Sequence, residues 1–267
     1  MTVPMDLQGT AAVLTGAGSG IGRATALSLA ARGASVLVSD LDDARAKETA
    51  ALVETAGGAA IAQAADVSDQ DDLEALRDRC LDAFGRLDLV MNNVGVLAMG
   101  APEALPIEAW QRVIDLNLVS VARSNLVFLP LLIAQGSGHV VNTSSASGLL
   151  AYGFDRLPYV ATKHAVVGIS EALALYLAPK GVGVTCLCPS GVATNILEQI
   201  TVYGEATSPR APQHPIVFPD VVGELVAEAI SAGTFLVVTA PEIHDELQQR
   251  AADPEAYIQQ MIAEQTP

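Results

Sequence analysis

The segment Thr15-Gly-Ala-Gly-Ser-Gly-Ile-Gly22 follows an apolar run, Ala11–Thr15, and leads into a stretch with helical character, Gly20–Arg32. Glycines allow the backbone to turn sharply and to approach a pyrophosphate, whose charge is stabilised by free N–H groups and by the helix dipole. A plain tight turn would also use glycines, and the spacing differs from the fingerprint Gly-x-Gly-x-x-Gly. The position between a first strand and a first helix favours phosphate binding. The expected contacts with such a ligand are Gly16, Ser19, Gly20, Ile21 and Gly22.

Short apolar runs alternate with amphipathic stretches of helical length over the first two-thirds of the chain. The predicted strands are Ala11–Thr15, Ser35–Ser39, Ala59–Ala64, Leu87–Met91, His139–Thr143 and Val182–Leu187. The predicted helices are Gly20–Arg32, Asp42–Ala56, Asp69–Phe84, Pro106 to about Val127, and Tyr159–Ala178. Strands that are apolar on both faces are typical of a parallel sheet covered by helices on both sides. The sequence therefore predicts an α/β fold of the Rossmann type, with a doubly wound, mainly parallel sheet and helices on both of its faces.

The remaining segments predict how the chain is organised outside this alternation. The 267 residues show no internal repeat and no interdomain linker, so we expect a single domain over residues 1–267. Prolines and glycines are frequent in residues 189–219, which are expected to form a loop that closes over the bound ligands as a lid. The mostly polar residues 242–264 are expected to form a helical tail.

Composition excludes several classes of partner. Thirty acidic residues against fourteen basic ones leave a formal net charge of −16, which argues against binding to nucleic acid or to anionic membrane surfaces. The longest apolar stretch, Leu126–Ala134, is too short to span a bilayer. The start of the chain lacks the features of a signal peptide, the three cysteines form no disulfide framework, and the four histidines show no metal-ligand spacing. We expect a cytoplasmic protein without a metal.

Asp40, at the end of the second predicted strand, bears on the choice of nucleotide. A carboxylate at this position accepts hydrogen bonds from the hydroxyls of an adenosine ribose and repels a 2′-phosphate. A helix N-cap after the strand is an equally good explanation of this residue taken alone. No cation stands at Ser19 or Leu41, from where it would neutralise a 2′-phosphate. NAD is therefore favoured over NADP, and Leu41 is expected near the adenosine.

The pair in Tyr159-Val-Ala-Thr-Lys163 is the main indication of catalysis. Residues at i and i+4 lie on one face of a helix, so the phenol and the ammonium group are neighbours. A free tyrosine titrates near ~10, and a cation in a cleft would lower that pKa and make the phenol a usable base. A surface hydrogen bond is the alternative explanation of this spacing. Upstream, Val140-Val-Asn-Thr-Ser-Ser-Ala-Ser-Gly148 places hydroxyls at the carboxyl end of a buried strand, where open α/β sheets bind ligands.

Taken together and in this order, the motifs resemble those of the short-chain dehydrogenase/reductase family over almost the whole chain. The motifs that carry the resemblance are Thr15–Gly22, Asn92-Asn-Val-Gly95, the helix with Asn117, Ser-Ser-x-Ser-Gly148 and Tyr159-x-x-x-Lys163. Three departures stand out. Val94 replaces the usual alanine, Ser190 replaces the glycine expected after Pro189, and the segment from Ser145 to Tyr159 is slightly long, so Ser144 and Ser147 stay as alternatives to Ser145.

The resemblance implies a role for each matching residue. Tyr159 would be the general acid/base, Lys163 would lower its pKa and bind the nicotinamide ribose, and Ser145 would hold the substrate oxygen. Asn117 would position a water that relays protons from Lys163. Contacts with the cofactor are also implied for Asp66, Val67, Asn93 and Thr194. The family further implies a homotetramer or a homodimer, joined through the helices 106–127 and 159–178.

The expected function is reversible hydride transfer between NAD and a mainly apolar secondary alcohol or ketone. The apolar residues expected to line the substrate pocket are Leu97, Met99, Leu149, Leu150, Tyr152, Phe154, Ile196, Leu197, Ile200, Tyr203 and Phe218. Arg156 and Arg210 are possible anchors for an anionic substrate tail, although exposed cations need no such role. The alternatives are an NADPH-dependent reductase of ketones or 3-oxoacyl thioesters and a non-catalytic nucleotide sensor. The presence of Ser145, Tyr159 and Lys163 together disfavours the sensor.

Overall fold

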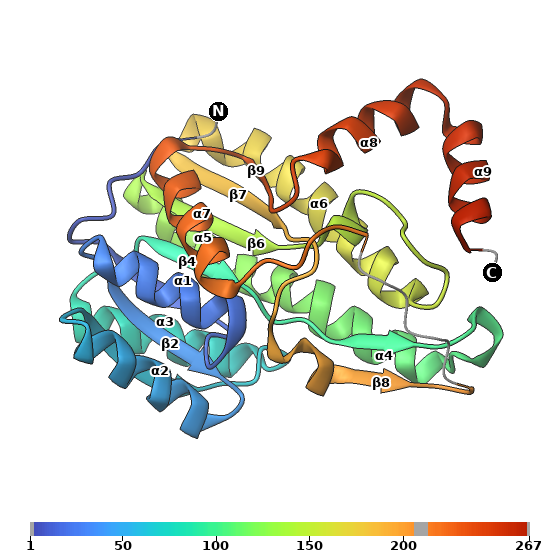
Figure 1. The fold of residues 1–267 in the computed structure, drawn as a ribbon. Helices are drawn as coiled ribbons and strands as arrows, with labels where there is room; N and C mark the ends of the chain where they lie inside the picture. The colour runs from blue at the N-terminus through green and yellow to red at the C-terminus, as the bar shows by residue number, and fades with distance from the viewer. Residues whose placement is uncertain (1–2, 206–212, 266–267) are drawn as a thin grey trace.

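The computed structural model describes residues 3–205 and 213–265, and its centre is a seven-stranded parallel sheet (Figure 1). The strand order is β3-β2-β1-β4-β6-β7-β9. The strands are β1 Ala11–Leu14, β2 Ser35–Asp40, β3 Ala59–Ala64, β4 Leu89–Asn92, β6 Gly138–Thr143, β7 Val182–Cys188 and β9 Leu236–Val238. The order reverses between β1 and β4, and ligands bind such sheets at the carboxyl edge next to this switch point. The predicted Rossmann-type parallel sheet is confirmed.

Helices cover both faces of this sheet, as expected for a doubly wound fold. One hydrophobic cluster joins the sheet to α1 (Gly20–Ala31), α2 (Asp43–Thr55) and α7 (Pro219–Ala232). The cluster on the opposite face includes α3 (Gln70–Phe84), α5 (Ser120–Gln135) and α6 (Leu157–Leu177). Alternate residues of β1 point into the two clusters, so both faces of the strand are apolar.

The helix predicted to end near Val127 continues to Gln135. It consists of α4 (Ile107–Ile114), a π-helical turn (Asp115–Val119) and α5, with Pro130 inside α5. The prediction stopped early because proline lacks the N–H that continues a helix. Here Phe128 and Leu132, on either side of Pro130, are fully buried against the sheet, and this packing outweighs the lost hydrogen bond.

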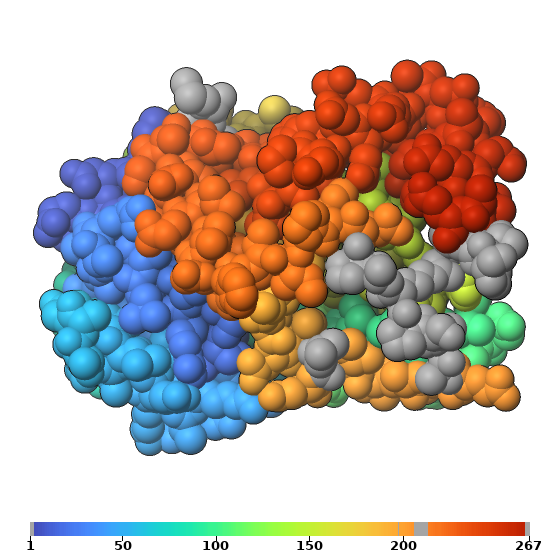
Figure 2. All heavy atoms as spheres, in the orientation of Figure 1, coloured from blue at the N-terminus to red at the C-terminus, as the bar shows by residue number. Residues whose placement is uncertain are grey.

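The last two predicted segments are more ordered than the sequence indicated. Within residues 189–219, a short 3-10 helix (Asn195–Gln199) precedes β8 (Ile200–Val202), which pairs with β5 (Leu97–Met99) in a separate two-stranded parallel sheet. The tail is two helices, α8 (Glu242–Ala252) and α9 (Pro254–Gln265), which extend over the molecule at the right of Figure 1. Figure 2 shows the tail helices and the described residues of the segment after β7 on the same side of the molecule.

Two helical stretches are long and apolar enough to cross a membrane by length and composition, namely 107–135 and 157–180. Both pack one side against the sheet, as core helices of a globular fold do. Their other side remains exposed: Leu126 of α5 keeps 67 % of its surface accessible and Leu175 of α6 keeps 81 %. Apolar surface of this kind is typical of a contact with another protein molecule.

Candidate active site

The glycine-rich segment forms a backbone cradle at the carboxyl end of β1. Gly16 and Gly20 have φ angles of +60° and +53°, in the left-handed region that favours glycine. Gly18 and Gly22 leave no room for a side chain: a Cβ would lie 2.7 Å from the Asp40 carboxylate at Gly18 and 2.4 Å from the Gly16 carbonyl at Gly22. The cradle leads directly into the N-terminus of α1, so it fits the pyrophosphate of a dinucleotide.

The predicted cofactor residues around this cradle come together in the structure. Ser19 is the N-cap of α1, and its hydroxyl makes no capping hydrogen bond. Thr194, from the segment after β7, lies against Gly20, where an added Cβ would be 3.0 Å from its methyl group. Asn93 braces the turn because its Nδ2 donates to the Gly16 carbonyl (3.0 Å), while its Oδ1 accepts from the Thr143 hydroxyl (3.2 Å). Ile21 is half-buried and packs against the core.

Asp40 lies beside the cradle, and its carboxylate is hydrogen-bonded to the backbone of the cradle. Oδ2 accepts a hydrogen bond from the Gly18 N–H (3.0 Å) and Oδ1 accepts one from the Asp42 N–H (3.1 Å). The helix N-cap is Asp42 rather than Asp40, because the Asp42 side chain accepts from two N–H groups of the first turn of α2. Leu41 is exposed. The N-cap explanation of Asp40 is therefore wrong.

Arg45 is a cation near this carboxylate that the sequence analysis missed. Its guanidinium pairs with Asp42 (3.4 Å) and with Glu198 of the 3-10 helix after β7 (2.9 Å). The 153 residues between Arg45 and Glu198 explain why no local pattern indicated the pair.

Arg23 is a second cation at the cradle, since its guanidinium donates to the Gly18 carbonyl (2.6 Å) and pairs with Glu48 (2.6 Å). The acids Asp40, Asp42, Glu48 and Glu198 still outnumber the two arginines, so the surroundings of the cradle stay negative.

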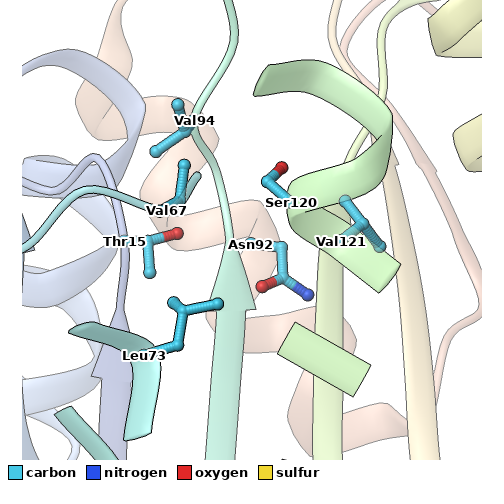
Figure 3. A pocket seen from close by; sticks show the side chains of 7 residues that line it. All are labelled: Thr15, Val67, Leu73, Asn92, Val94, Ser120 and Val121. Carbon is cyan, nitrogen blue, oxygen red and sulfur yellow. The ribbon is translucent and has the colours of Figure 1, made fainter. Parts of the chain in front are cut away.

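Asp66 and Val67 lie in the segment that follows β3, and Val67 reaches the ends of β1 and β4 at Thr15 and Asn92. The Asp66 Oδ1 accepts a hydrogen bond from the Ser68 N–H (2.8 Å), so this oxygen stabilises its own turn. Val67 lines a small pocket close to the cradle, shown in Figure 3. Its other lining residues are Thr15, Leu73, Asn92, Val94, Ser120 and Val121. The pocket has room for about one water molecule, so it is too small to hold a nucleotide base.

The predicted catalytic side chains lie at the carboxyl end of β6 and on α6. The Lys163 ammonium group donates to the Thr143 carbonyl (2.9 Å) and lies 5.6 Å from the centre of the Tyr159 ring. The Ser145 hydroxyl accepts from the Ser147 N–H (3.1 Å), and its hydrogen bonding with Tyr159 lowers the pKa of that phenol. Tyr159, Lys163 and Ser145 thus form one group, in which Lys163 and Ser145 are buried and Tyr159 is half-buried.

Close contact between β6 and α6 makes this group possible. A Cβ on Gly148 would lie 2.6 Å from the Lys163 carbonyl, so only glycine lets the two segments approach. The Ser144 hydroxyl donates to the same carbonyl (2.7 Å) and is buried, which gives it a bracing role. Ser144 is therefore no longer an alternative to Ser145 as the residue that holds a substrate oxygen.

Asn117 lies in the π-helical turn between α4 and α5, and both polar atoms of its side chain are hydrogen-bonded to the backbone. Oδ1 accepts from the Val96 N–H (2.8 Å) and Nδ2 donates to the Val96 carbonyl (3.0 Å). The pair of bonds fixes the strand that follows Gly95, beside the Lys163 ammonium group. A π-helical turn disturbs the regular helical hydrogen bonding and often occurs at functional sites.

Burial shifts both catalytic pKa values. The pKa of Lys163 is lowered to about 8, because a buried ammonium group loses hydration. Burial raises the pKa of Tyr159, against the opposing effects of the Ser145 hydroxyl and the Arg156 charge. The predicted lowering of the Tyr159 pKa by Lys163 is therefore not found in the protein alone, because desolvation of the phenolate is the larger effect. Arg156, which was expected to be either an anchor for an anionic tail or an ordinary exposed cation, pairs with Asp155 (2.8 Å), and its charge lowers the pKa of the Tyr159 phenol.

Two residues expected around the substrate lie elsewhere. Leu150 is fully buried in a cluster with Ile243 of α8 and Met261 of α9. Phe218 keeps 67 % of its surface exposed at the start of α7, away from a closed pocket. Arg210 lies outside the described residues.

The cradle and the phenol–amine pair share one edge of a doubly wound sheet, and this arrangement defines a dinucleotide-binding oxidoreductase. The family model for short chain dehydrogenases matches residues 10–202. A cyclohexanol dehydrogenase from Acinetobacter sp. (strain SE19) is 36 % identical over 239 residues, covering 88 % of this chain and 92 % of that protein. The chain belongs to the short-chain dehydrogenase/reductase family.

Solved structures agree with this assignment. A short-chain dehydrogenase/reductase from Burkholderia phymatum in complex with NAD has a TM-score of 0.84 and 32 % identity, covering 94 % of this chain and 96 % of that one. A 3-ketoacyl-(acyl-carrier-protein) reductase from Brucella melitensis complexed with NADH has a TM-score of 0.78 and 28 % identity, covering 88 % of this chain and 98 % of that one.

Proposed function

We propose that the protein is an NAD-dependent dehydrogenase/reductase that interconverts a mainly apolar secondary alcohol and its ketone. The observation that carries this proposal is the group of Tyr159, Ser145 and Lys163, with the last two buried, at the sheet edge that also holds the glycine cradle. A non-catalytic protein that only senses nucleotides would need the cradle but not the catalytic group.

This group has the chemistry that the reaction needs. NAD⁺, when bound, supplies the carbon that accepts the hydride. Tyr159 takes the proton of the substrate hydroxyl during oxidation and returns it to the oxygen during reduction. Ser145 donates a hydrogen bond to that oxygen, where negative charge develops. Lys163 binds the ribose hydroxyls and, through a water held near Asn117, exchanges the proton of Tyr159 with solvent.

The charges around the cradle support NAD rather than NADP. Asp40 stands where a ribose hydroxyl would donate to it, and a 2′-phosphate would meet its negative charge. Arg45 is paired with Asp42 and Glu198, which reduces its capacity to neutralise a phosphate. The pair also ties the segment after β7 to α2, in support of a lid over residues 189–219 that closes on the bound cofactor.

An assay with purified protein tests the function directly. Cyclohexanol and a panel of related alcohols and ketones are supplied with each cofactor, and the cofactor absorbance is followed. We expect turnover of apolar secondary alcohols, with a kcat/KM at least about tenfold higher with NAD⁺ than with NADP⁺, as charge repulsion of about 1.4 kcal/mol would produce. Preference for NADPH and a 3-oxoacyl thioester would support the alternative reductase, a reaction type named for the Brucella melitensis structure.

The pKa values of the catalytic group predict the pH dependence of ketone reduction. Tyr159 has a raised pKa and stays protonated as a proton donor at neutral pH. Lys163 is charged below its pKa of about 8 and loses its charge above it. We expect kcat/KM to be constant at neutral pH and to fall above about 8, because a neutral amine holds the ribose and the phenol less well. A pH profile of wild type and Lys163→Arg checks this, since arginine stays charged, and a wild-type rate that rises through pH 8 would contradict it.

The exposed apolar sides of α5 and α6 support self-association into a homodimer or homotetramer. Leu126→Asp combined with Leu175→Asp is expected to yield monomers in light scattering, because the charges would be buried against apolar surface. Leu52→Asp on α2, another exposed leucine, is the matched control and should keep the wild-type mass. A monomeric wild type would refute the proposal.

The state of the cysteines is compatible with the proposed location of the protein in the cytoplasm. Cys80, Cys186 and Cys188 are free and buried. The sulfur atoms of Cys186 and Cys188 lie 3.7 Å apart and share a hydrogen bond, with no disulfide between them. Thiols stay reduced in that compartment.

A further inference from the structure

Ser190 stands where the family usually has a glycine, and it is hydrogen-bonded to Thr239, directly after β9. The Ser190 N–H donates to Thr239 Oγ1 (2.8 Å), and the two hydroxyl oxygens lie 2.8 Å apart. A glycine would keep only the first of these bonds, because it has no side chain. β7 and β9 are neighbours in the sheet (Figure 1), so the pair ties the ends of two adjacent strands together. The function described above uses neither hydroxyl.

The residue before Ser190 is bound to the catalytic loop. The Pro189 carbonyl accepts a hydrogen bond from the Ala146 N–H (2.8 Å), and Ala146 directly follows Ser145. Strands that share such bonds lie ~4.8 Å apart. The backbone at Pro189 is therefore about one strand spacing from the loop that carries Ser145, and Ser190 is the next residue in the chain.

Residues 189–194, which we call the bridge segment, run from this loop to the glycine cradle. In the middle of the segment, Val217 exchanges two backbone hydrogen bonds of 2.9 Å with it. At its end, Thr194 lies against Gly20, where an added Cβ would be 3.0 Å from the Thr194 methyl group. The bridge segment is thus held at its start, its middle and its end, and Thr239 provides the side-chain contact at the start.

The two ends of the bridge segment are the two places that a dinucleotide has to reach. Its pyrophosphate fits the cradle, and its reacting ring exchanges a hydride beside Ser145 and Tyr159. The reacting half of the cofactor therefore lies along the bridge segment, whose position decides how the ring meets the catalytic group. A displacement of about 1 Å between reacting groups can cost a factor of about 100 in rate.

We propose that Ser190 and Thr239 are positioning residues for the reacting ring of the dinucleotide, because they fix the start of the bridge segment. They act through this segment and need no contact of their own with the substrate. The inference rests on the proposed function, from which it takes the cofactor.

Binding of NAD⁺ and of ADP-ribose to Thr239→Val tests the inference. Valine has a similar shape but leaves the Ser190 N–H and hydroxyl without their partner. ADP-ribose keeps the adenosine, the pyrophosphate and the second ribose of NAD⁺ and lacks only the reacting ring. We expect the dissociation constant of NAD⁺ to rise about fivefold or more in calorimetry, as loss of a hydrogen bond predicts, and that of ADP-ribose to stay within about twofold. A loss of general stability would affect both ligands equally.

Three further variants complete the experiment. Thr239→Ser keeps the hydroxyl and should restore the wild-type ratio of the two dissociation constants. Ser190→Ala removes only the hydroxyl contact, so it replaces Thr239→Val if that variant fails to fold, and it should weaken NAD⁺ about threefold without affecting ADP-ribose. Thr55→Val is the matched control, because the exposed Thr55 hydroxyl donates within its own helix α2 (2.7 Å). It should bind both ligands as wild type does.

Equal weakening of both ligands, or no change in either, would overturn the inference. The titrations contain no alcohol, so a protein that shows the expected difference but oxidises no alcohol supports the inference and contradicts the proposed substrate class. If NADP⁺ is the better cofactor, the same comparison with NADP⁺ and 2′-phospho-ADP-ribose decides the inference, and only the proposed preference for NAD is wrong.

Discussion

Tyr159→Phe is expected to lower kcat/KM for the alcohol by about 10³-fold or more, while NAD⁺ still binds with nearly unchanged affinity. The substitution removes the one hydroxyl that exchanges the substrate proton, a step that general acid–base catalysis accelerates by ~10²–10⁴-fold. The aromatic ring stays, so the packing of α6 and the position of Lys163 are retained. Steady-state kinetics and calorimetric titration with NAD⁺ measure the two effects separately.

The control for this variant is Tyr176→Phe, which removes an exposed phenol from the end of α6 and leaves the catalytic group intact. Its activity should stay within a few-fold of wild type. If Tyr159→Phe retained most of its activity, another group would have to exchange the proton, and the assignment of Tyr159 would be wrong.

Gly22→Ala is expected to remove most of the affinity for NAD⁺ and to destabilise the fold. The added methyl group would lie 2.4 Å from the Gly16 carbonyl, so the glycine-rich turn has to move. Displacing two N–H groups from a pyrophosphate costs about 3 kcal/mol, or roughly a 100-fold higher dissociation constant. Crowding in a packed region adds a loss of ~1–3 kcal/mol in the free energy of unfolding. Calorimetry with NAD⁺ and thermal unfolding measure these losses.

Gly58→Ala separates the loss of affinity for NAD⁺ from the loss of stability. A Cβ there would crowd Val53 and Ala30 at 2.8 and 2.9 Å, in the turn before β3 and away from the cradle. This variant should unfold at a lower temperature than wild type yet bind NAD⁺ with normal affinity. Equal loss of affinity in both variants would mean that crowding acts through general destabilisation and that the Gly22 cradle has no special part in binding.

Local patterns predicted the regular elements well, and the failures have clear causes. Six of the seven strands of the sheet agree with the predicted apolar runs to within one or two residues, because burial on both faces leaves a continuous apolar signal. The short strand β9 and the helix α7 before it were not predicted. The helix predicted to end near Val127 continues to Gln135, because the packing of Phe128 and Leu132 carries it past Pro130. The tail was taken for one polar helix, since its few apolar residues form a cluster only with the distant Leu150.

In the active site, too, local motifs predicted some features, and contacts between distant segments decided the others. The positions of Asn93, Ser145, Tyr159 and Lys163 beside one another agree with the order of the family motifs. The direction of the Tyr159 pKa was wrong, because a spacing of four residues shows the nearby amine but not the desolvation of the phenol. The pairing of Arg45 with Glu198 joins residues too far apart in the chain for any spacing to predict.

The sequence by itself determined the kind of protein, a parallel α/β fold with a phosphate-binding turn and a tyrosine–lysine pair. Each of these depends on residues within a few positions of one another, where backbone geometry alone sets their distances. Only the tertiary structure decided which charges surround Asp40, how deeply the phenol is buried, and that Thr239, after β9, meets Ser190 beside the catalytic loop. Those properties arise from contacts between distant segments, and burial and electrostatics depend on everything that packs around a group.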